Sequence, residues 1–265
     1  MKHFLIFISA LILFNPISVM SKELTGRQIM ELQQKRHMVK NDTASIVLRL
    51  IDRKGNEKKR IFKRYGKEFR NGLKRGLIVF VEPKDIAGTA LLTWEIEGGK
   101  SKQWLYLPRQ KRMQRITSHG KKGYFMGTDF TFKDLQPDAI ENYKYTILRS
   151  EEMDGSDCYV IEAIPATKEK QRDSGYSKRL FWLRKNIYFP VKIEFYDRRG
   201  RLLKTQTNQG ITNLRGSAWM TKRSLMENHK EKHTTIMRVE KQGIDIPLKD
   251  RIFTERFILS GKHLK

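Results

Sequence analysis

Hydrophobic and polar residues alternate along much of the chain, and alternation with a period of two predicts β-strands. The clearest cases are residues 44–50 and 90–96, where every second side chain is apolar. Residues 77–81 form an unbroken apolar run that ends before Pro83, which is typical of a strand buried on both faces. Residues 52–56, Asp-Arg-Lys-Gly-Asn, have the composition of a tight hairpin turn. These segments together indicate antiparallel pairing.

The same pattern continues toward the C-terminus. Further strands are predicted near residues 61–65, 104–107, 113–117, 143–149, 158–164, 180–183, 191–196, 218–226 and 234–241. Roughly ten strands at hairpin spacing favour one large antiparallel sheet that curls into a barrel or half-barrel. Before the first strand, Thr25 and Gln28 form a capping-box pattern that predicts a helix ending near Met38. The expected fold class is therefore mainly β with a few helices.

The first 21 residues have the pattern of an export signal. Lys2 gives a positive start, residues 4–14 are apolar, and small residues up to Ser21 fit a peptidase site. We therefore expect cleavage after Ser21, which leaves residues 22–265 as one exported domain. An uncleaved anchor is the alternative, but a membrane span needs about 20 apolar residues. No cysteine lies near the cut, so the exported chain is expected to carry no attached lipid.

Residues 123–132 combine four aromatic side chains and a methionine with glycines. A mobile lid has such a composition, with an apolar inner side and hinges at Gly123 and Gly127. A loop that plugs the core is an equally good interpretation, because surface loops rarely carry this much aromatic area.

Sequence signatures of catalysis are absent. The chain has no Gly-x-Ser-x-Gly elbow, no phosphate-binding glycine loop and no His-Glu-x-x-His helix. His229 and His233 are four residues apart, but a hairpin between two strands is expected there, and on an extended strand they would be too far apart for one metal ion. Cys158 is the only cysteine, which excludes an intrachain disulfide, and it lies in an apolar strand. We expect neither an enzyme nor a metal or cofactor site.

The chain is strongly basic, with a formal net charge of +25. Removal of the leader lowers this by one, to +24, because Lys2 is its only charged residue. Residues 53–75 carry eleven basic side chains, and residues 100–122 carry eight with no acid. Such charge suggests nucleic acid, yet residues 75–81 resemble an RNA-binding strand without its stacking aromatics, so nucleic acid is not expected. For an exported chain the available anions are phospholipid head groups, lipopolysaccharide and wall polymers, and a solvated surface without a ligand is the simplest alternative.

Several motifs resemble the LolA-like outer-membrane lipoprotein-sorting family, and they follow the same order over most of the mature chain. They are Leu-Thr-Gly-Arg-Gln-Ile-Met at 24–30, Leu-Ile-Asp-Arg-Lys-Gly at 50–55, Gly-Thr-Ala-Leu-Leu-Thr-Trp at 88–94, Gln-Trp-Leu-Tyr-Leu-Pro at 103–108, Lys-Arg-Met-Gln-Arg-Ile at 111–116, Phe-Met-Gly-Thr-Asp-Phe at 125–130, Cys-Tyr-Val-Ile-Glu-Ala at 158–163, Tyr-Ser-Lys-Arg at 176–179 and Glu-Phe-Tyr-Asp at 194–197. The resemblance implies a curved antiparallel sheet, an incomplete barrel with helices or a lid covering its concave side.

The resemblance also implies a function. Members of this family carry acyl chains across the periplasm in an apolar hollow, without a cofactor, so lipid or lipoprotein acyl chains are the expected cargo. A membrane transporter or an outer-membrane receptor is the expected protein partner. The candidates for the hollow and its lid are Trp94, Trp104, Tyr106, Phe125, Met126, Phe130, Tyr159 and Trp182. For each of them ordinary barrel core is at least as good an explanation.

The charge adds a second hypothesis. Arg109, Lys111, Arg112 and Arg115 are candidates for docking anionic head groups, an anionic membrane surface or an acidic partner. The rival function is an exported basic module that binds envelope polyanions. That module predicts steeply salt-dependent binding without an apolar cavity.

Overall fold

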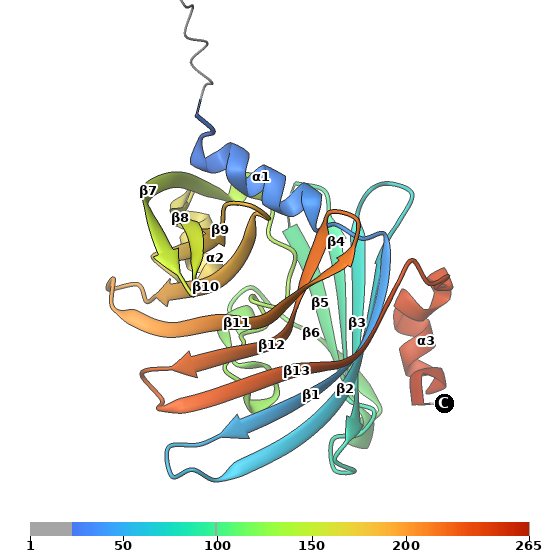
Figure 1. Cartoon of the computed structure of the whole chain (residues 1–265). Coiled ribbons are helices and arrows are strands. Elements are labelled where there is room, and N and C mark those ends of the chain that lie inside the picture. Colours follow the sequence, from blue (N-terminus) through green and yellow to red (C-terminus); the bar gives the residue numbers. More distant parts are fainter. Residues whose placement is uncertain (1–22, 99, 265) are drawn as a thin grey trace, which may run out of the picture.

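In the part of the chain that the structure describes, thirteen antiparallel strands form one curved sheet (Figure 1). The computed structural model describes residues 23–98 and 100–264; the expected leader and its cleavage site lie outside these residues. One half of the sheet contains β1 (Asn41–Ile51), β2 (Glu57–Glu68), β3 (Lys74–Glu82), β4 (Ala90–Ile96), β5 (Lys100–Leu107) and β6 (Arg112–Arg115). The other half contains β7 (Tyr143–Met153), β8 (Ser156–Pro165), β9 (Lys178–Arg184), β10 (Phe189–Tyr196), β11 (Leu202–Arg215), β12 (Ala218–Asn228) and β13 (His233–Ile244).

The strand order is β6-β5-β4-β3-β2-β1-β13-β12-β11-β10-β9-β8-β7. Each strand therefore pairs with its neighbour in sequence, except that β1 also pairs with β13 and β6 does not pair with β7. The sheet is thus an incomplete barrel, as expected. Because β6 and β7 are its two edges, residues 116–142, the crossing segment, must cross the opening between them.

The local predictions for the first half are confirmed. Helix α1 (Gly26–Arg36) begins with the expected capping box between Thr25 and Gln28. Asp52 accepts hydrogen bonds from the backbone of Lys54 and Asn56 in the β1–β2 turn, where Gly55 has φ +83°. Residues 77–80 of the predicted strand at 77–81 are covered on both faces, because one face of β3 packs on residues from the crossing segment and the other on C-terminal residues; Val81 at its end is exposed.

Three elements were not predicted. They are β11, α2 (Lys168–Ser174) and α3 (Glu255–Leu259). Strand β11 is the longest, but only three of its fourteen side chains are buried, so it lacks an apolar repeat. It forms because β10 and β12 supply hydrogen-bonding partners on both sides.

The two faces of the β3–β5 region pack against different segments. Phe80 and Leu91 face the concave side, where Phe125 of the crossing segment packs on them. Leu77 and Leu92 face outward and are covered by Phe253 and Ile258 of residues 245–264, which we call the C-terminal segment. Figure 1 shows this arrangement, with the crossing segment inside the curve of the sheet and α3 outside it. Helix α1 packs over β7 to β9 at the other end of the concave side. Within the described residues, no helix is long and apolar enough to span a bilayer.

Candidate functional site

Residues 116–142, which we call the crossing segment, fill much of the concave side. Phe125 is only 2% exposed and contacts the rings of Phe80 and Phe132, with centroids 5.6 and 5.5 Å apart. Phe130 is buried in a second cluster with Phe195 and other residues of the sheet. The interpretation of this segment as a loop that plugs the core is therefore the one that the structure supports.

Three aspartates of the crossing segment bind basic side chains on three strands of the opposite half. Asp129 accepts a 2.7 Å hydrogen bond from Thr235 on β13, and its Oδ2 also lies 2.7 Å from Nδ1 of His233. Asp134 pairs with Lys204 on β11 at 2.6 Å. Asp138 pairs with Arg179 on β9 at 2.7 Å. We call these contacts the carboxylate anchors; together they hold the crossing segment against the sheet.

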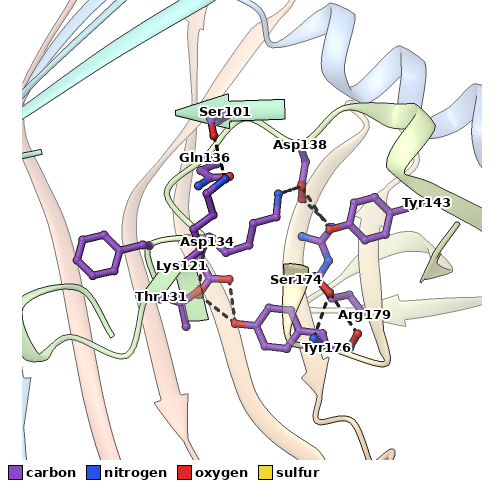
Figure 2. Close-up of polar contacts among 12 residues, drawn as sticks. Ser101, Lys121, Thr131, Asp134, Gln136, Asp138, Tyr143, Ser174, Tyr176 and Arg179 are labelled. Carbon is purple, nitrogen blue, oxygen red and sulfur yellow. Dashed lines mark hydrogen bonds and ion pairs between the residues drawn. The ribbon is translucent and has the colours of Figure 1, made fainter. Parts of the chain in front are cut away.

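The middle anchor is buried. Lys204 has no solvent exposure, and its Nζ donates to the Asp134 carboxylate and, at 2.9 Å, to the backbone carbonyl of Asp129. Tyr176 donates to the same carboxylate at 3.0 Å, as Figure 2 shows. Burial, and then the Asp134 charge, raises the pKa of Tyr176, so it remains a donor at neutral pH. An unpaired ammonium would be very costly here, so the carboxylate and lysine depend on each other.

In the third anchor the Asp138 carboxylate forms ion pairs with two cations, Arg179 and Lys133. Burial by itself would raise the pKa of Asp138, but Arg179 and Lys133 act against this and hold it below its ordinary value. The Arg179 guanidinium also lies over the ring of Tyr143, 4.4 Å from its centroid. Figure 2 shows Arg179 and Tyr143 both directed toward Asp138. The carboxylate is therefore ionised over the whole range of neutral pH.

A cavity of about 420 Å³ lies between the crossing segment and the concave face of β1 to β4. Its floor contains Gly66 and Gly76, which pair directly across β2 and β3. The absence of a side chain at Gly76 leaves space on a sheet that is otherwise densely packed, whereas the Asp42 carboxylate occupies the corresponding position above Gly66. A Cβ atom at Gly76 would have only a backbone oxygen within reach, at 3.9 Å. Ile78, Leu91 and Leu135 supply apolar surface to the same cavity.

Of the four basic residues at this cavity, Arg64 and Lys74 share the concave face with Phe62 and Ile78, whereas the side chains of Lys67 and Arg75 point to the outer face. Arg64 forms an ion pair with Asp42 of β1. Lys67 pairs with Asp250, which follows β13, at 2.7 Å. The guanidinium of Arg75 stacks between two rings, 4.3 Å from the centroid of Phe69 and 4.4 Å from that of Trp94. An apolar floor beside Arg64 and Lys74 can accommodate an amphiphile that has an anionic head.

Only part of the expected lining lies on the concave side. Phe125, Met126 and Phe130 do, as members of the crossing segment. Trp94 and Trp104, whose rings make an edge contact at 4.8 Å, face outward instead. Tyr106 faces outward with them, beneath the C-terminal segment. The reason is register: these three alternate with Leu91 and Leu105, which point to the concave side.

The two remaining aromatic candidates lie elsewhere. Trp182 packs with Cys158 and Val160 on the face of β8 and β9 that points away from α1, and its Nε1 donates to Glu151 at 3.2 Å. Tyr159 is half-buried at the edge of the cluster beneath α1, with the Lys185 ammonium 4.9 Å from its ring centroid. Neither side chain lies at the cavity of Gly66 and Gly76.

The four candidate docking residues are exposed at the β5–β6 edge of the sheet. Arg109 lies in a short 3₁₀ turn after β5, and Lys111, Arg112 and Arg115 follow it into β6. Of these, Arg115 also lines a second, polar cavity.

The remaining candidate chemical groups are His229, His233 and Cys158. His229 and His233 flank the β12–β13 turn, as the hairpin prediction required, and His229 contacts Thr205 at 2.8 Å. Cys158 is buried, and burial raises the pKa of its thiol.

Sequence reasoning did not find the carboxylate anchors or the paired glycines. One signal was available for the anchors: three aspartates follow within ten residues of each other after an acid-free basic stretch. The glycines carry no such signal, because only the strand register brings Gly66 opposite Gly76.

Comparison with known proteins gives matches of sequence and of structure. A family model described as "Uncharacterized protein" matches residues 72–260. A domain from Vibrio parahaemolyticus, whose name assigns it to outer membrane lipoprotein sorting, is 32% identical with a TM-score of 0.83. The match covers 88% of this chain and 98% of that domain. No curated protein sequence matches the chain.

Two further solved structures are similar. A DUF1329 family protein from Desulfovibrio piger is 27% identical with a TM-score of 0.82, over 88% of this chain and 97% of the other. A LolA superfamily protein from Nitrosomonas europaea is 21% identical with a TM-score of 0.69, over 89% and 100%. The last similarity concerns the fold alone.

Proposed function

The chain belongs to the LolA-like superfamily, and from this premise we propose that it is a periplasmic carrier of lipid or lipoprotein acyl chains. The protein holds the acyl chains on the concave side of its sheet and moves them toward the outer membrane without a cofactor or a catalytic step. A membrane transporter would supply the cargo and an outer-membrane receptor would accept it.

The observation that carries this proposal is the cavity above Gly66 and Gly76. It has a volume of about 420 Å³ and combines an apolar floor with the basic residues Arg64 and Lys74 on the same face of the sheet. Each methylene group transferred from water into such a site contributes about 0.8 kcal/mol, so a single acyl chain supplies substantial affinity.

Longer cargo requires the crossing segment to give way. Phe125, Phe132 and Leu135 cover concave-face residues that an acyl chain would otherwise contact. These apolar contacts can be exchanged for lipid contacts at little cost, whereas the carboxylate anchors set the cost of moving the segment. Cargo entry at the cavity would begin beside Asp134, the residue of the central anchor.

Filling the cavity tests the proposal. Gly76→Phe places an aromatic ring above a position with free space and an ordinary backbone conformation. We expect the affinity for the neutral fluorescent probe N-phenylnaphthylamine, and for lipids that displace it, to fall by about tenfold or more. The matched control is Val81→Phe, on the exposed part of the same strand.

Mass spectrometry of lipids extracted from protein purified under native conditions gives an independent readout. Absence of bound lipid, together with absence of probe uptake by the unmodified protein, would refute the carrier function. Binding that survives about 0.5 M salt distinguishes the carrier from a module that binds envelope polyanions, whose affinity falls steeply with salt.

A further inference from the structure

A second cavity, of about 370 Å³, lies at the edge of the sheet, where β5 and β6 approach α2 and the start of β7. It shares only Gln136 with the cavity of Gly66 and Gly76. Its lining is of a different kind, with six basic and two acidic side chains. The basic residues are Lys100, Lys102, Arg115, Lys121, Lys133 and Lys170, and the acidic residues are Glu169 and Asp173.

Most of these cations have no carboxylate partner. Within residues 23–98 and 100–264, only Lys133 of the six forms an ion pair, with Asp138 at 3.2 Å. Lys121 is held in place by donating to the backbone carbonyl of Ser101 at 2.8 Å, as Figure 2 shows. Several unpaired cations are thus gathered around one space that is large enough for a small ligand.

The electrostatics of the cavity favour an anion. The pKa of Lys121 is lowered, first by burial and then by the nearby charge of Lys133, with Arg115 and Lys170 adding to the effect and Asp173 opposing it. The cations therefore repel one another, and a bound anion would relieve this repulsion. Thr117 and Ser118 also line the cavity and offer hydroxyl donors. Lysine ammonium groups and hydroxyls together are suited to the oxygens of a phosphate.

We propose that this cavity, the basic edge site, binds a phosphate-bearing anion. In a carrier the natural source is the phosphate of a lipid head group, held at the edge of the sheet while acyl chains occupy the concave side. That assignment of the source rests on the proposed function, whereas phosphate binding itself does not. The site is formed by residues from β5, β6, the crossing segment and α2, so it exists only in the folded chain.

The test compares two pairs of charge removals. Lys102→Gln with Arg115→Gln removes two cations of the basic edge site that make no ion pair in the described structure. The control, Lys54→Gln with Lys84→Gln, removes the same charge from exposed turns after β1 and β3. These turns lie at the opposite end of the strands from the start of β5. Isothermal titration calorimetry with inorganic phosphate and with monomeric dihexanoyl phosphatidylglycerol then measures binding.

We expect saturable binding by the unmodified protein, weakened about tenfold in the edge-site pair and unchanged in the control pair. Binding of both probes supports a head-group site, and binding of inorganic phosphate alone supports a site for free phosphate. Absence of saturable binding of either probe, or an equal loss in both variant pairs, would overturn the proposal. Gly76→Phe should keep phosphate binding while losing the apolar probe, so failure of the edge site and failure of the carrier function are separable.

Discussion

The β3–β5 region of the sheet is covered on both faces by apolar side chains, but only the concave cover is also tied by ion pairs to the opposite half of the sheet. On the concave face Phe125 packs on Phe80 and Leu91, and the crossing segment is attached further by Asp134 to buried Lys204 and by Asp138 to Arg179. On the outer face the C-terminal segment is attached mainly by the fully buried side chains of Phe253 and Ile258. Polar contacts are added there too: Trp94 Nε1 donates to the Phe253 carbonyl at 2.8 Å, and Lys67 donates to the Leu248 carbonyl at 2.6 Å and pairs with Asp250 at 2.7 Å.

The two kinds of attachment respond differently to movement of the cover. The free energy gained by apolar burial is lost gradually as surface is exposed. On the outer face only water would replace the contacts that are lost. Ion pairs and hydrogen bonds are lost over a short distance, and they can be exchanged for other polar partners. The concave cover is therefore suited to open for cargo, whereas the outer cover is suited to keep the sheet rigid.

The largest expected effect follows from breaking the central anchor. Asp134→Leu leaves the Lys204 ammonium buried without its counter-ion, so we expect the free energy of unfolding to fall by about 3–5 kcal/mol. Urea denaturation measures this change. Adding Lys204→Met should restore much of the loss, because the uncompensated charge is then removed. Glu57→Gln, which breaks the exposed Arg49–Glu57 pair, is the control and should leave stability unchanged.

The same variant also probes cargo entry. Asp134→Leu should increase uptake of the neutral fluorescent probe, since the crossing segment has lost its central attachment. Unchanged uptake with reduced stability would show that this anchor is structural only.

A smaller effect is expected on the outer cover. Ile258→Ala deletes three buried carbon atoms beneath the sheet and should lower the free energy of unfolding by about 3 kcal/mol. Its urea midpoint should fall while probe uptake stays at the level of the unmodified protein. Increased uptake in this variant would contradict the assignment of the two covers to different roles.

The smallest effect is a pH dependence of the outer cover. His263, whose Nε2 lies 3.1 Å from the Gly88 carbonyl, has a pKa held below its ordinary value of 6.5, chiefly by burial. The folded state thus favours the neutral ring. Its contribution to stability is complete above pH 6.5 and is lost as the pH falls from there through the lowered pKa.

Thermal melting between about pH 7.5 and 5 should show a steeper loss for the unmodified protein than for His263→Gln. Asp138 titrates in the same sense but at lower pH, because its pKa is held below the ordinary carboxyl range. Identical pH profiles for the two proteins would remove His263 from this account.

Much of the fold follows from local patterns. The capping box at Thr25 and Gln28, the turn at Asp52 and the alternation in β1 each depend on neighbouring residues, and each was predicted. Strand β11 was missed because its side chains are largely polar and its pairing partners decide its conformation. Five of the candidates for the hollow and its lid are buried (Trp104, Tyr106, Phe125, Phe130 and Trp182), but the face of the sheet on which each lies was not predictable.

The amino-acid pattern alone was enough to predict a curled antiparallel sheet with a leading helix. It also located the aromatic side chains that lie between glycines in residues 123–132. Alternation divides each strand into two faces, but it does not say which face is concave. That was decided by the curvature of the sheet and by two segments distant in sequence, one bringing Phe125 to the inside and the other Phe253 to the outside. The same long-range pairing placed Gly66 opposite Gly76 and gathered eight ionisable side chains from four parts of the chain around the basic edge site. The charge that dominates the composition thus acquires a location only in the folded protein.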